Sequence, residues 1–504
     1  MFFLLLLLSL FLGALLIREY LRRKYAFAKD LPVAERTKEI FGIEYGLVGM
    51  TDEQRFDIVN KVFRDNDRLF QIWVGPVVLL GVSHPDLIQK VLAHTDCLQK
   101  PFFYDFVGFE HGIFSAKYDL WKGQRKALNP TFNLRILNSF VPIFVTCCRK
   151  LVDEMHQVKE GETIDMFKYT SKCALEMICG TTLGSDALNR DGKDAFLSHL
   201  EEIFGYISRR MLGMHLHLDV IYKLTPSYRK EMHARKESVI FASKIVQEKK
   251  EAFRLAQQTK TTPVSNDSDP EAEDYKKPQI FIDQLLSMSD NSRAFTDEEI
   301  LHNVFVMLVA GNDTSGLAVA HASLFLAMYQ NIQEKVYTEI IEHFPTEDVP
   351  VTAESLKLLV YTEMFIKEVL RHCPVAPNIA RQNMKPIELD GINIPAGNVF
   401  IFTFWTLHRR KDIWGPNAYE FDPDNFLPER CRDRNPNAYM PFSTGARNCL
   451  GARYAMISVK VMLIYILRNF RLHTEIRHED IKYKFGMTLK MNIHHSIQLE
   501  KRKS

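Results

Sequence analysis

Near its C-terminus the chain reads Phe442-Ser-Thr-Gly445-Ala-Arg447-Asn-Cys449-Leu-Gly451, and an apolar, helix-like stretch follows from Ala452 to about Arg468. A cysteine just before a helix N-terminus faces backbone N–H groups and the positive end of the helix dipole. Both favour the thiolate over the thiol. Gly445 and Gly451 leave room for a flat ligand to approach the backbone, and Arg447 is placed to neutralise an acidic group on that ligand. The alternative is a free cysteine that packs as a small hydrophobe.

A long helix is predicted to begin at Thr296, where Thr296 and Glu299 form a capping box. Apolar residues continue at three- and four-residue spacing past Leu324 without a proline. About 30 helical residues span about 45 Å, enough to cross a domain. In the middle stands Ala310-Gly311-Asn-Asp313-Thr314-Ser315, whose acid, hydroxyl and glycine are locally unfavourable in a helix. Such conflicts tend to mark functional sites.

Both motifs resemble those of cytochrome P-450 haem-thiolate monooxygenases, namely F-x-x-G-x-R-x-C-x-G and the oxygen-activation motif A/G-G-x-D/E-T-T/S. The resemblance implies that Cys449 is the fifth ligand of a haem iron, where a thiolate favours O–O cleavage. It implies that Gly311 lets the cofactor approach the helix, that Thr314 hydrogen-bonds bound oxygen and that Asp313 relays protons. The plainer alternative for Thr314 is a bond back to the carbonyl of Ala310 that bends the helix. Both can hold.

Further motifs extend the resemblance. Trp121-Lys-Gly-Gln-Arg125 matches the family's W-x-x-x-R, with tryptophan and arginine about one helical turn apart. By the resemblance, Arg125, Arg381 and Arg447 bind haem propionates, and Trp121 and Phe442 belong to the same cofactor site. An isolated arginine would more often be a solvated surface charge.

Glu368 and Arg371 match the family's E-x-x-R motif, in which a buried ion pair braces the core. The helix that carries them is predicted to end before Pro374. Asn425 stands where the family usually has a further arginine, and Arg430 is a candidate to replace it. An ordinary surface pair between Glu368 and Arg371 would be the default elsewhere.

Two further segments resemble motifs of the clan that contains fatty-acid ω-hydroxylases and arthropod detoxifying enzymes. They are Phe421-Asp-Pro-Asp-Asn-Phe426 and Tyr439-Met-Pro-Phe-Ser443. Many members of that clan esterify a glutamate to haem at the position of Ala310. Because alanine forms no ester, we expect haem b to be held non-covalently. The missing glutamate also weakens the expectation of ω-hydroxylation.

The composition of the chain gives information on its binding partners and on the cellular compartment that it faces. The chain has 504 residues, 46% of them hydrophobic, with 64 Lys+Arg against 62 Asp+Glu and a net charge of +2. This balance gives no support for nucleic-acid binding. Eight cysteines without a C-x-x-C pair indicate a reduced, cytosol-facing protein.

The predicted organisation has three parts. Residues 1–21 form a signal-anchor, since the apolar run Met1–Ile17 precedes a basic flank and lacks a convincing cleavage site. A cleaved secretory signal is the alternative. Residues 22–50 form the basic flank and linker, and 51–504 form one haem-binding domain, with a polar loop at about 257–279. The fold class is mainly α with a small β region, the cytochrome P-450 fold. Leu218–Tyr222 and Ile387–Val399 are expected to be short strands or loops.

The resemblance implies an endoplasmic-reticulum monooxygenase that inserts one oxygen atom from O2 into a lipophilic small molecule. Electrons come from NADPH through a separate reductase, an acidic partner for the basic helix 117–126, and cytochrome b5 is a second candidate partner. No GxGxxG or P-loop signature supports a nucleotide site in this chain. Two rivals remain: a reductase-independent peroxide isomerase or dehydratase, and a non-catalytic, membrane-tethered haem protein. Asp313 and Thr314 argue against both.

Overall fold

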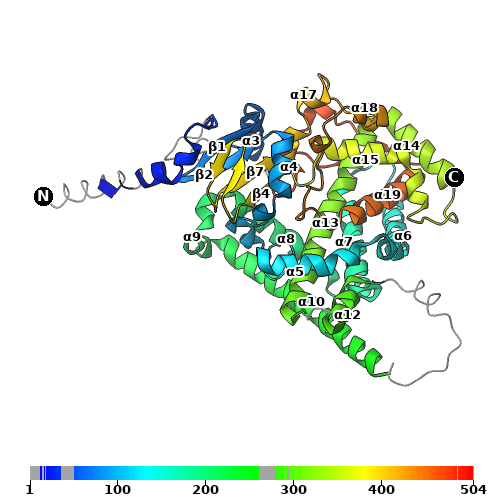
Figure 1. Cartoon of the computed structure of the whole chain (residues 1–504). Coiled ribbons are helices and arrows are strands. Elements are labelled where there is room, and N and C mark those ends of the chain that lie inside the picture. Colours follow the sequence, from blue (N-terminus) through cyan, green and yellow to red (C-terminus); the bar gives the residue numbers. More distant parts are fainter. Residues whose placement is uncertain are drawn as a thin grey trace. The chain divides into compact units, whose positions relative to one another are not determined.

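The computed structural model describes residues 12–13, 16, 19–35, 50–259, 279–291, 295–484 and 486–502. The chain divides into two compact units (Figure 1). Unit 1 comprises the chain up to Pro101 together with Asn378–Ala418 and Asn435–Asn448, and unit 2 comprises Phe102–Pro377, Tyr419–Arg434 and Cys449–Ser504. Most of the predicted anchor at 1–21, residues 36–49 of the predicted linker at 22–50 and most of the loop at 257–279 lie outside the described residues.

Unit 1 is built on a four-stranded sheet. Its members, in the order β1-β2-β7-β4, are β1 (Leu69–Val74), β2 (Val77–Val82), β7 (Val399–Thr403) and β4 (Asn378–Gln382). β1 and β2 form an antiparallel hairpin, β7 runs parallel to β2, and β4 closes the sheet antiparallel to β7. A two-stranded hairpin of β5 (Ile387–Leu389) and β6 (Ile392–Ile394) confirms the expected strands near 387–399.

Helices pack on this sheet through apolar faces. The buried core of unit 1 combines Leu80 and Phe400 of the sheet with Ile88 and Leu92 of a helix. Among the described residues from 50 onward, the α-helices of unit 1 are α3 (Asp52–Arg64), α4 (Pro85–Ala93), α16 (Phe404–Leu407) and α17 (Lys411–Trp414). α4 ends at Ala93, and its last carbonyls face the cysteine-motif loop described below.

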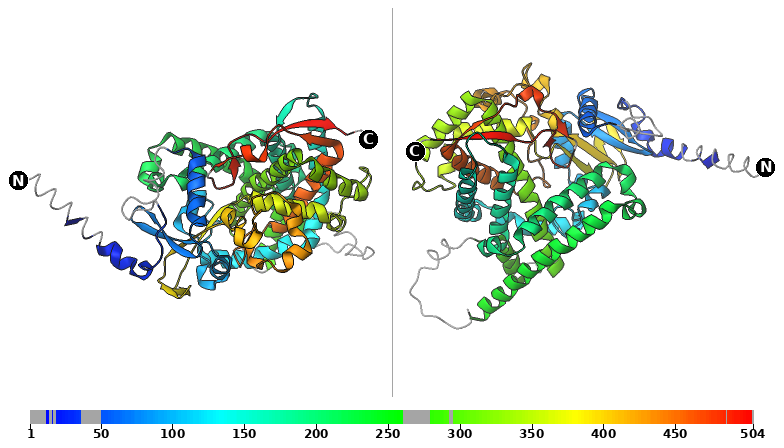
Figure 2. Two further views of the ribbon diagram at one scale, coloured as in Figure 1. Left: turned by 90° about the horizontal axis from the view of Figure 1, so that it is seen from above. Right: turned by 180° about the vertical axis from the view of Figure 1, so that it is seen from behind.

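Unit 2 is mainly helical. In the part of the unit that the structure describes, the α-helices are α5 (Tyr118–Leu128), α6 (Leu134–His156), α7 (Met166–Leu183), α8 (Lys193–Leu212), α9 (Asp219–Lys223), α10 (Pro226–Thr259), α12 (Phe281–Asn291), α13 (Asp297–Met328), α14 (Gln330–His343), α15 (Val360–His372), α18 (Pro428–Arg432) and α19 (Ala452–Asn469). α10 packs along α8, as the views in Figure 2 show. The predicted excess of helix over strand is confirmed.

α13 is the central helix of unit 2 and packs mainly against α7, with further contacts to α19 (Figure 1). It starts as predicted, because Thr296 accepts from the backbone N–H of Glu299 at 3.1 Å and Glu299 accepts from that of Thr296 at 2.9 Å. By length and composition α13 could cross a membrane, yet most of it is buried inside the protein, which is the pattern of a core helix.

Small sheets complete unit 2. β3 (Thr163–Asp165), β11 (Ser496–Lys501) and β8 (Phe470–His473) form one sheet, with β11 in the middle. β9 (Tyr483–Lys484) and β10 (Lys490–Met491) form a short antiparallel pair in which Lys490 is opposite Lys484. The expectation of a strand or loop at Leu218–Tyr222 is wrong for most of that stretch, since residues 219–223 form the helix α9.

Candidate active site

The sulfur of Cys449 lies just before α19 in unit 2. The backbone N–H of Gly451 donates a hydrogen bond to it, and the guanidinium of Arg125 on α5 acts on it electrostatically. Burial raises the pKa of the Cys449 thiol, while the Gly451 N–H and the Arg125 charge oppose that rise. The N–H contact is of the kind that the sequence predicted beside the sulfur, and burial works against it. A bound cation would reverse this balance.

Cys449 is also accessible. It is exposed, although its thiol is strongly desolvated. A Cβ placed on Gly451 would meet nothing within 4 Å, so the backbone beside the sulfur has open space in front of it. This is the room that the sequence predicted at Gly451.

The first half of the cysteine motif belongs to unit 1. Gly445 has φ +74°, and a Cβ there would come within 2.0 Å of the carbonyl oxygen of Leu92 in α4. The prediction that Gly445 leaves room for a cofactor is therefore wrong, because the backbone of α4 fills that space. Ser443, one residue after the half-buried Phe442, also has a positive φ of +59°. Strained backbone of this kind clusters at ligand sites.

Three buried basic side chains lie near one another in unit 1. Arg381 on β4 donates to the carbonyl oxygen of Arg447 at 3.3 Å, and Arg447 donates to that of Leu98 at 2.9 Å. Burial, together with the charges of Arg447 and Arg381, holds the pKa of the buried Lys100 well below its usual range. Guanidinium groups of this kind can form charge-assisted hydrogen bonds with an anionic group. Sequence reasoning found both arginines but missed Lys100, which carries no motif.

The middle of α13 is its least covered part. Ala310 is exposed and Gly311, Asp313 and Thr314 are half-buried, whereas the helix on both sides is largely buried. The hydroxyl of Thr314 donates to the carbonyl oxygen of Ala310 at 2.6 Å, which is the plainer contact weighed above. That bond leaves the hydroxyl oxygen able to accept a second hydrogen bond.

Asp313 is held by the C-terminal segment. Its Oδ1 accepts from Nζ of Lys490 at 2.6 Å, and its Oδ2 accepts from the hydroxyl of Thr488 at 2.8 Å. Sequence reasoning missed both partners, because they lie far along the chain and belong to no motif.

Gly311 permits close packing of two helices. A Cβ there would come within 2.7 Å of the side chain of Ile178 on α7. The glycine is thus required by the contact between α13 and α7, and its role toward a cofactor stays a prediction.

The pair Glu368–Arg371 on α15 is fully buried, as predicted. Arg371 donates to both carboxylate oxygens of Glu368, at 2.7 and 2.8 Å. Burial pushes the pKa of Glu368 upward, but the hydrogen bonds and charges of Arg371 and His372 prevail and lower it to about 2. Breaking one partner of such a pair costs about 3–5 kcal/mol.

Asn425 occupies the place of the family's usual arginine. Its side chain donates to Glu368 Oε1 at 3.2 Å, and the backbone N–H of Asp422 donates to the same oxygen at 2.8 Å. Arg430 pairs with the side chain of Asp422 at 2.6 Å, so it is not the substitute considered above. His372, which sequence reasoning missed, lies 3.5 Å from Glu368 Oε1.

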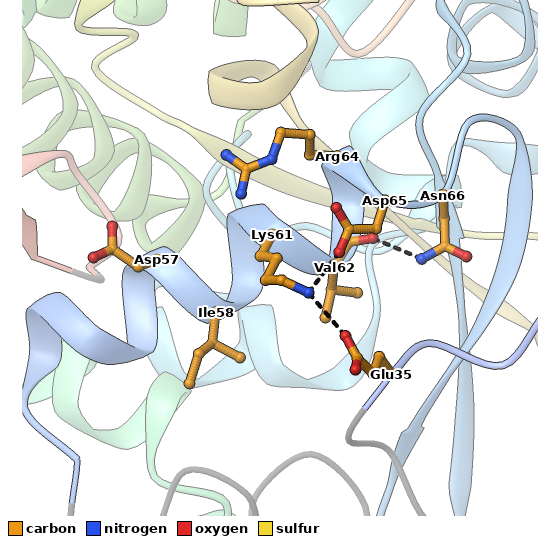
Figure 3. Close-up of a pocket in the computed structure, with 8 residues that line it drawn as sticks. All are labelled: Glu35, Asp57, Ile58, Lys61, Val62, Arg64, Asp65 and Asn66. Carbon is orange, nitrogen blue, oxygen red and sulfur yellow. Dashed lines mark hydrogen bonds and ion pairs between the residues drawn. The ribbon is translucent and has the colours of Figure 1, made fainter.

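The pockets elsewhere do not compete with this site. A surface pocket around α3 is lined mainly by charged side chains, three of which pair with each other (Figure 3). In it, Lys61 Nζ lies 2.8 Å from a carboxylate oxygen of Glu35 and of Asp65. A second pocket beside α14 is lined by Glu334, Glu339 and Glu342, of which Glu339 accepts from the first N–H groups of α15.

These features fit the expected haem. Cys449 offers an accessible sulfur with open backbone beside it at Gly451, and Arg125 and the buried Trp121 lie on α5. Within the described residues, no group of three or more His, Cys, Asp and Glu side chains forms a separate metal site.

Comparisons with known proteins agree with the resemblance to cytochromes P-450. The family model described as Cytochrome P450 matches residues 37–497 and so spans both units. Cytochrome P450 4c21 of Blattella germanica is 32% identical over 473 residues, which cover 93% of this chain and 92% of that protein. Probable cytochrome P450 313a4 of Drosophila melanogaster is 29% identical over 91% of this chain and 92% of its own. Cytochrome P450 4V2 of Homo sapiens is 28% identical, with 95% and 91% covered. The chain therefore belongs to the cytochrome P450 family of haem-thiolate monooxygenases and binds haem b non-covalently.

Proposed function

We propose that this enzyme inserts one oxygen atom from O2 into a lipophilic small molecule, using electrons that a separate reductase takes from NADPH. The observation that carries the proposal is the environment of Cys449, an accessible sulfur held by the Gly451 N–H and near the Arg125 guanidinium. Haem bound there would supply the O2 activation, which thiolate ligation favours.

The protein's own residues bind, orient and supply protons. Cys449 is the proposed iron ligand, and Arg125, Arg381, Arg447 and Lys100 are proposed to neutralise the propionates. The hydroxyl of Thr314, on the half-buried middle of α13, is proposed to accept or pass a proton, and Asp313 is proposed as the acid of the same segment. Ala310 offers no carboxyl for an ester link.

We further propose a membrane location in the endoplasmic reticulum, with the catalytic residues on the cytosolic side. Besides the apolar N-terminal run, the support is an exposed apolar patch at and around α9, formed by Leu218, Val220, Ile221 and Leu224. Val220 is 75% and Leu224 82% exposed. Contiguous exposed apolar side chains of this kind mark interaction sites for lipid or protein.

The reductase is proposed to approach the basic side of α5. Lys122 and Lys126 are exposed on that helix, which also carries Arg125 near the Cys449 sulfur. Complementary charge would favour encounter with an acidic partner. Cytochrome b5 is a second candidate for the same surface.

Two measurements test this function. The dithionite-reduced protein with carbon monoxide should show the difference spectrum of a thiolate-ligated haem, and NADPH should be consumed only when a reductase is present. Cys449→Ser should lose the thiolate spectrum and the turnover. Cys431→Ser is the matched control, because Cys431 is the other exposed cysteine and should leave both unchanged.

Other outcomes would point elsewhere. Conversion of a hydroperoxide without NADPH or reductase would favour the peroxide isomerase or dehydratase. A thiolate spectrum without either activity would favour a haem-binding protein that is not catalytic. Unchanged turnover in Cys449→Ser would overturn the proposed ligand.

A further inference from the structure

The loop that leads into α5 is held on the first half of α13. Residues 109–116, called the docking loop below, follow a short 3-10 helix (Phe102–Val107) and precede α5. Two backbone N–H groups of the loop donate to side chains of α13. The N–H of His111 donates to Nδ1 of His302 at 3.2 Å, and that of Ile113 donates to Oδ1 of the fully buried Asn303 at 3.0 Å. Two adjacent residues of one helix therefore fix the loop.

Close packing accompanies these two hydrogen bonds. A Cβ on Gly112 would come within 2.8 Å of the carbonyl oxygen of His302, so only glycine permits this approach. The ring of Phe109 stacks on that of Phe305 in α13, with 4.7 Å between the ring centres and 7° between the planes. Phe109 has a positive φ of +52°. Such backbone costs free energy in a residue other than glycine, and the packing on α13 offsets that cost.

The docking loop is also bonded to α5. The side-chain amide of Gln124, which is fully buried, donates to the carbonyl oxygen of His111 at 2.6 Å. His111 is thus held on both sides, by α13 through its N–H and by α5 through its carbonyl. Gln124 directly precedes Arg125, whose guanidinium acts on the Cys449 sulfur. A displacement of His111 is therefore felt by the helix that carries Arg125.

The contact between His111 and His302 depends on the protonation state of His302. A backbone N–H can only donate, so Nδ1 of His302 must be the acceptor. An imidazolium carries a proton on both ring nitrogens and cannot accept. Protonation of His302 and this hydrogen bond exclude each other. Asn303 has no such dependence, because its amide oxygen accepts at any pH near neutrality.

The charged and titratable groups that face His302 come from α13 and from the docking loop. Burial lowers the pKa of His302 from its ordinary value of 6.5, and the charge of His111 lowers it further, whereas Glu298 and Glu110 oppose this. Nε2 of His111 lies 3.7 Å from a carboxylate oxygen of Glu298. Because the docked state disfavours the proton, docking has its full strength above about pH 6.5 and weakens as the pH falls below it.

We propose that His302 is a positioning residue that fixes the docking loop on α13 only in its neutral form, so that acid releases the loop and, through Gln124, loosens the hold of α5 on haem. The step is a reversible proton transfer: Nδ1 takes up one proton from solvent, and the His111 N–H loses its acceptor. The link to haem rests on the proposed function, in which Arg125 binds a propionate.

The experiment measures hydrogen–deuterium exchange of residues 109–117 in the full-length, haem-loaded protein. Rates at pH 5.5 and pH 7.5 are corrected for the intrinsic exchange rate at each pH. His302→Asn keeps an acceptor at the place of Nδ1 but takes up no proton, and His302→Leu removes the acceptor. His343→Asn is the control, because His343 is a half-buried histidine at the end of α14, outside the docking loop and its contacts.

In the wild type we expect protection of the loop to fall by up to about tenfold from pH 7.5 to pH 5.5, the ratio for an undocked imidazole with a pKa of about 6.5. His302→Asn should keep its protection, and His302→Leu should be less protected at both pH values. His343→Asn should match the wild type. Charging of His111 affects wild type and His302→Asn alike, so their difference isolates His302. The same pH dependence in these two proteins, or unchanged protection in His302→Leu, overturns the proposal.

A second readout tests the link to haem. Transfer of haem to excess apomyoglobin is followed at the same two pH values. The wild type should release haem faster than His302→Asn at pH 5.5, by up to the factor seen in exchange, and at the same rate at pH 7.5. Equal release at pH 5.5 overturns the link through Gln124. If the wild type consumes no NADPH with reductase, the proposed function fails, while the exchange measurement still decides whether His302 controls docking.

Discussion

At the scale of single residues, Glu368 shows how a charge is kept inside the protein. A carboxylate without partners would not stay ionised at full burial. Here two donors from Arg371, the Asp422 N–H and the Asn425 amide surround it. Because Asn425 is neutral, Glu368 depends on Arg371 and His372 for the charges that lower its pKa to about 2.

Glu368→Ala should therefore destabilise unit 2 by about 3–5 kcal/mol, since it leaves the Arg371 guanidinium buried without its carboxylate. We expect protein with little haem, measured as haem per polypeptide, and a lower urea midpoint. The matched control is Glu354→Ala, which breaks an exposed Glu–Lys pair of the same spacing with Lys357. That control should cost less than about 1 kcal/mol, and normal haem content in Glu368→Ala would refute the assignment.

The same residue predicts a pH dependence. The pKa of Glu368 is about 2 in the folded protein against an ordinary value of 4.5, so the unfolded chain takes up the proton first as pH falls. Its contribution of roughly 3 kcal/mol is complete above about pH 4.5 and is lost between there and about pH 2. Urea unfolding at several pH values should show the gap between wild type and Glu368→Ala shrinking across this window. A constant gap would contradict the assigned pKa.

Residues that belong to a local motif were predictable, and those recruited by tertiary contact were not. Cys449, Arg371 and Arg381 sit at fixed offsets from recognisable neighbours. Lys100 and Lys490 have no such neighbours, and only the folded chain brings them to Arg447 and to Asp313. The sequence identified Gly445 as a position that requires glycine but gave the wrong reason for it. The reason is the carbonyl oxygen of Leu92, which lies close to Gly445 only in the folded chain.

At the scale of elements, glycine sets how closely α13 approaches α7. The carbonyl oxygen of Gly316 accepts from the hydroxyl of Thr170 at 2.8 Å. A Cβ on Gly316 would come within 2.6 Å of Cα and 2.9 Å of the backbone nitrogen of Ser171. Backbone atoms cannot move aside as a side chain can, so this contact depends on glycine.

Gly316→Ala should destabilise the protein by about 1–3 kcal/mol through overpacking, even though alanine is the better helix former. Gly205→Ala is the matched comparison, because Gly205 is an exposed position inside α8 with nothing within 4 Å of its Cβ direction. It should stabilise by about 0.5–1 kcal/mol. Opposite shifts in thermal midpoint are expected, and equal shifts would show that helix propensity alone decides both sites.

Long periodic elements were the most predictable. α13 has its capping box at Thr296, and α19 begins after Gly451, as expected from the sequence. α9 was not recognised as a helix because Asp219–Lys223 is too short to show a 3.6-residue period and carries exposed apolar side chains. Its apolar residues predicted a short strand or a loop, whereas the structure has a helix with several of them exposed at the surface.

At the scale of the whole molecule, the apolar patch around α9 bears on where the protein works. Leu218, Val220, Ile221 and Leu224 remain exposed although unit 2 has an extensive core in which to bury such side chains. A patch of this kind favours transfer into a lipid interface, where each apolar side chain contributes in proportion to the area removed from water. The apolar N-terminal run would then not be the sole segment that attaches the protein to a membrane.

A chain that lacks residues 1–21 should therefore still bind lipid vesicles, and the double variant Val220→Ser, Leu224→Ser should weaken that binding by about 2 kcal/mol, or roughly thirtyfold in partition coefficient. Co-sedimentation with phosphatidylcholine–phosphatidylserine vesicles measures both. Leu255→Ser is the control, because Leu255 is 60% exposed near the other end of α10 and lies outside the patch. Each variant keeps the haem motifs intact, so haem content should not change. Equal binding by the double variant and the control would mean that the patch does not meet lipid and that a protein partner covers it instead.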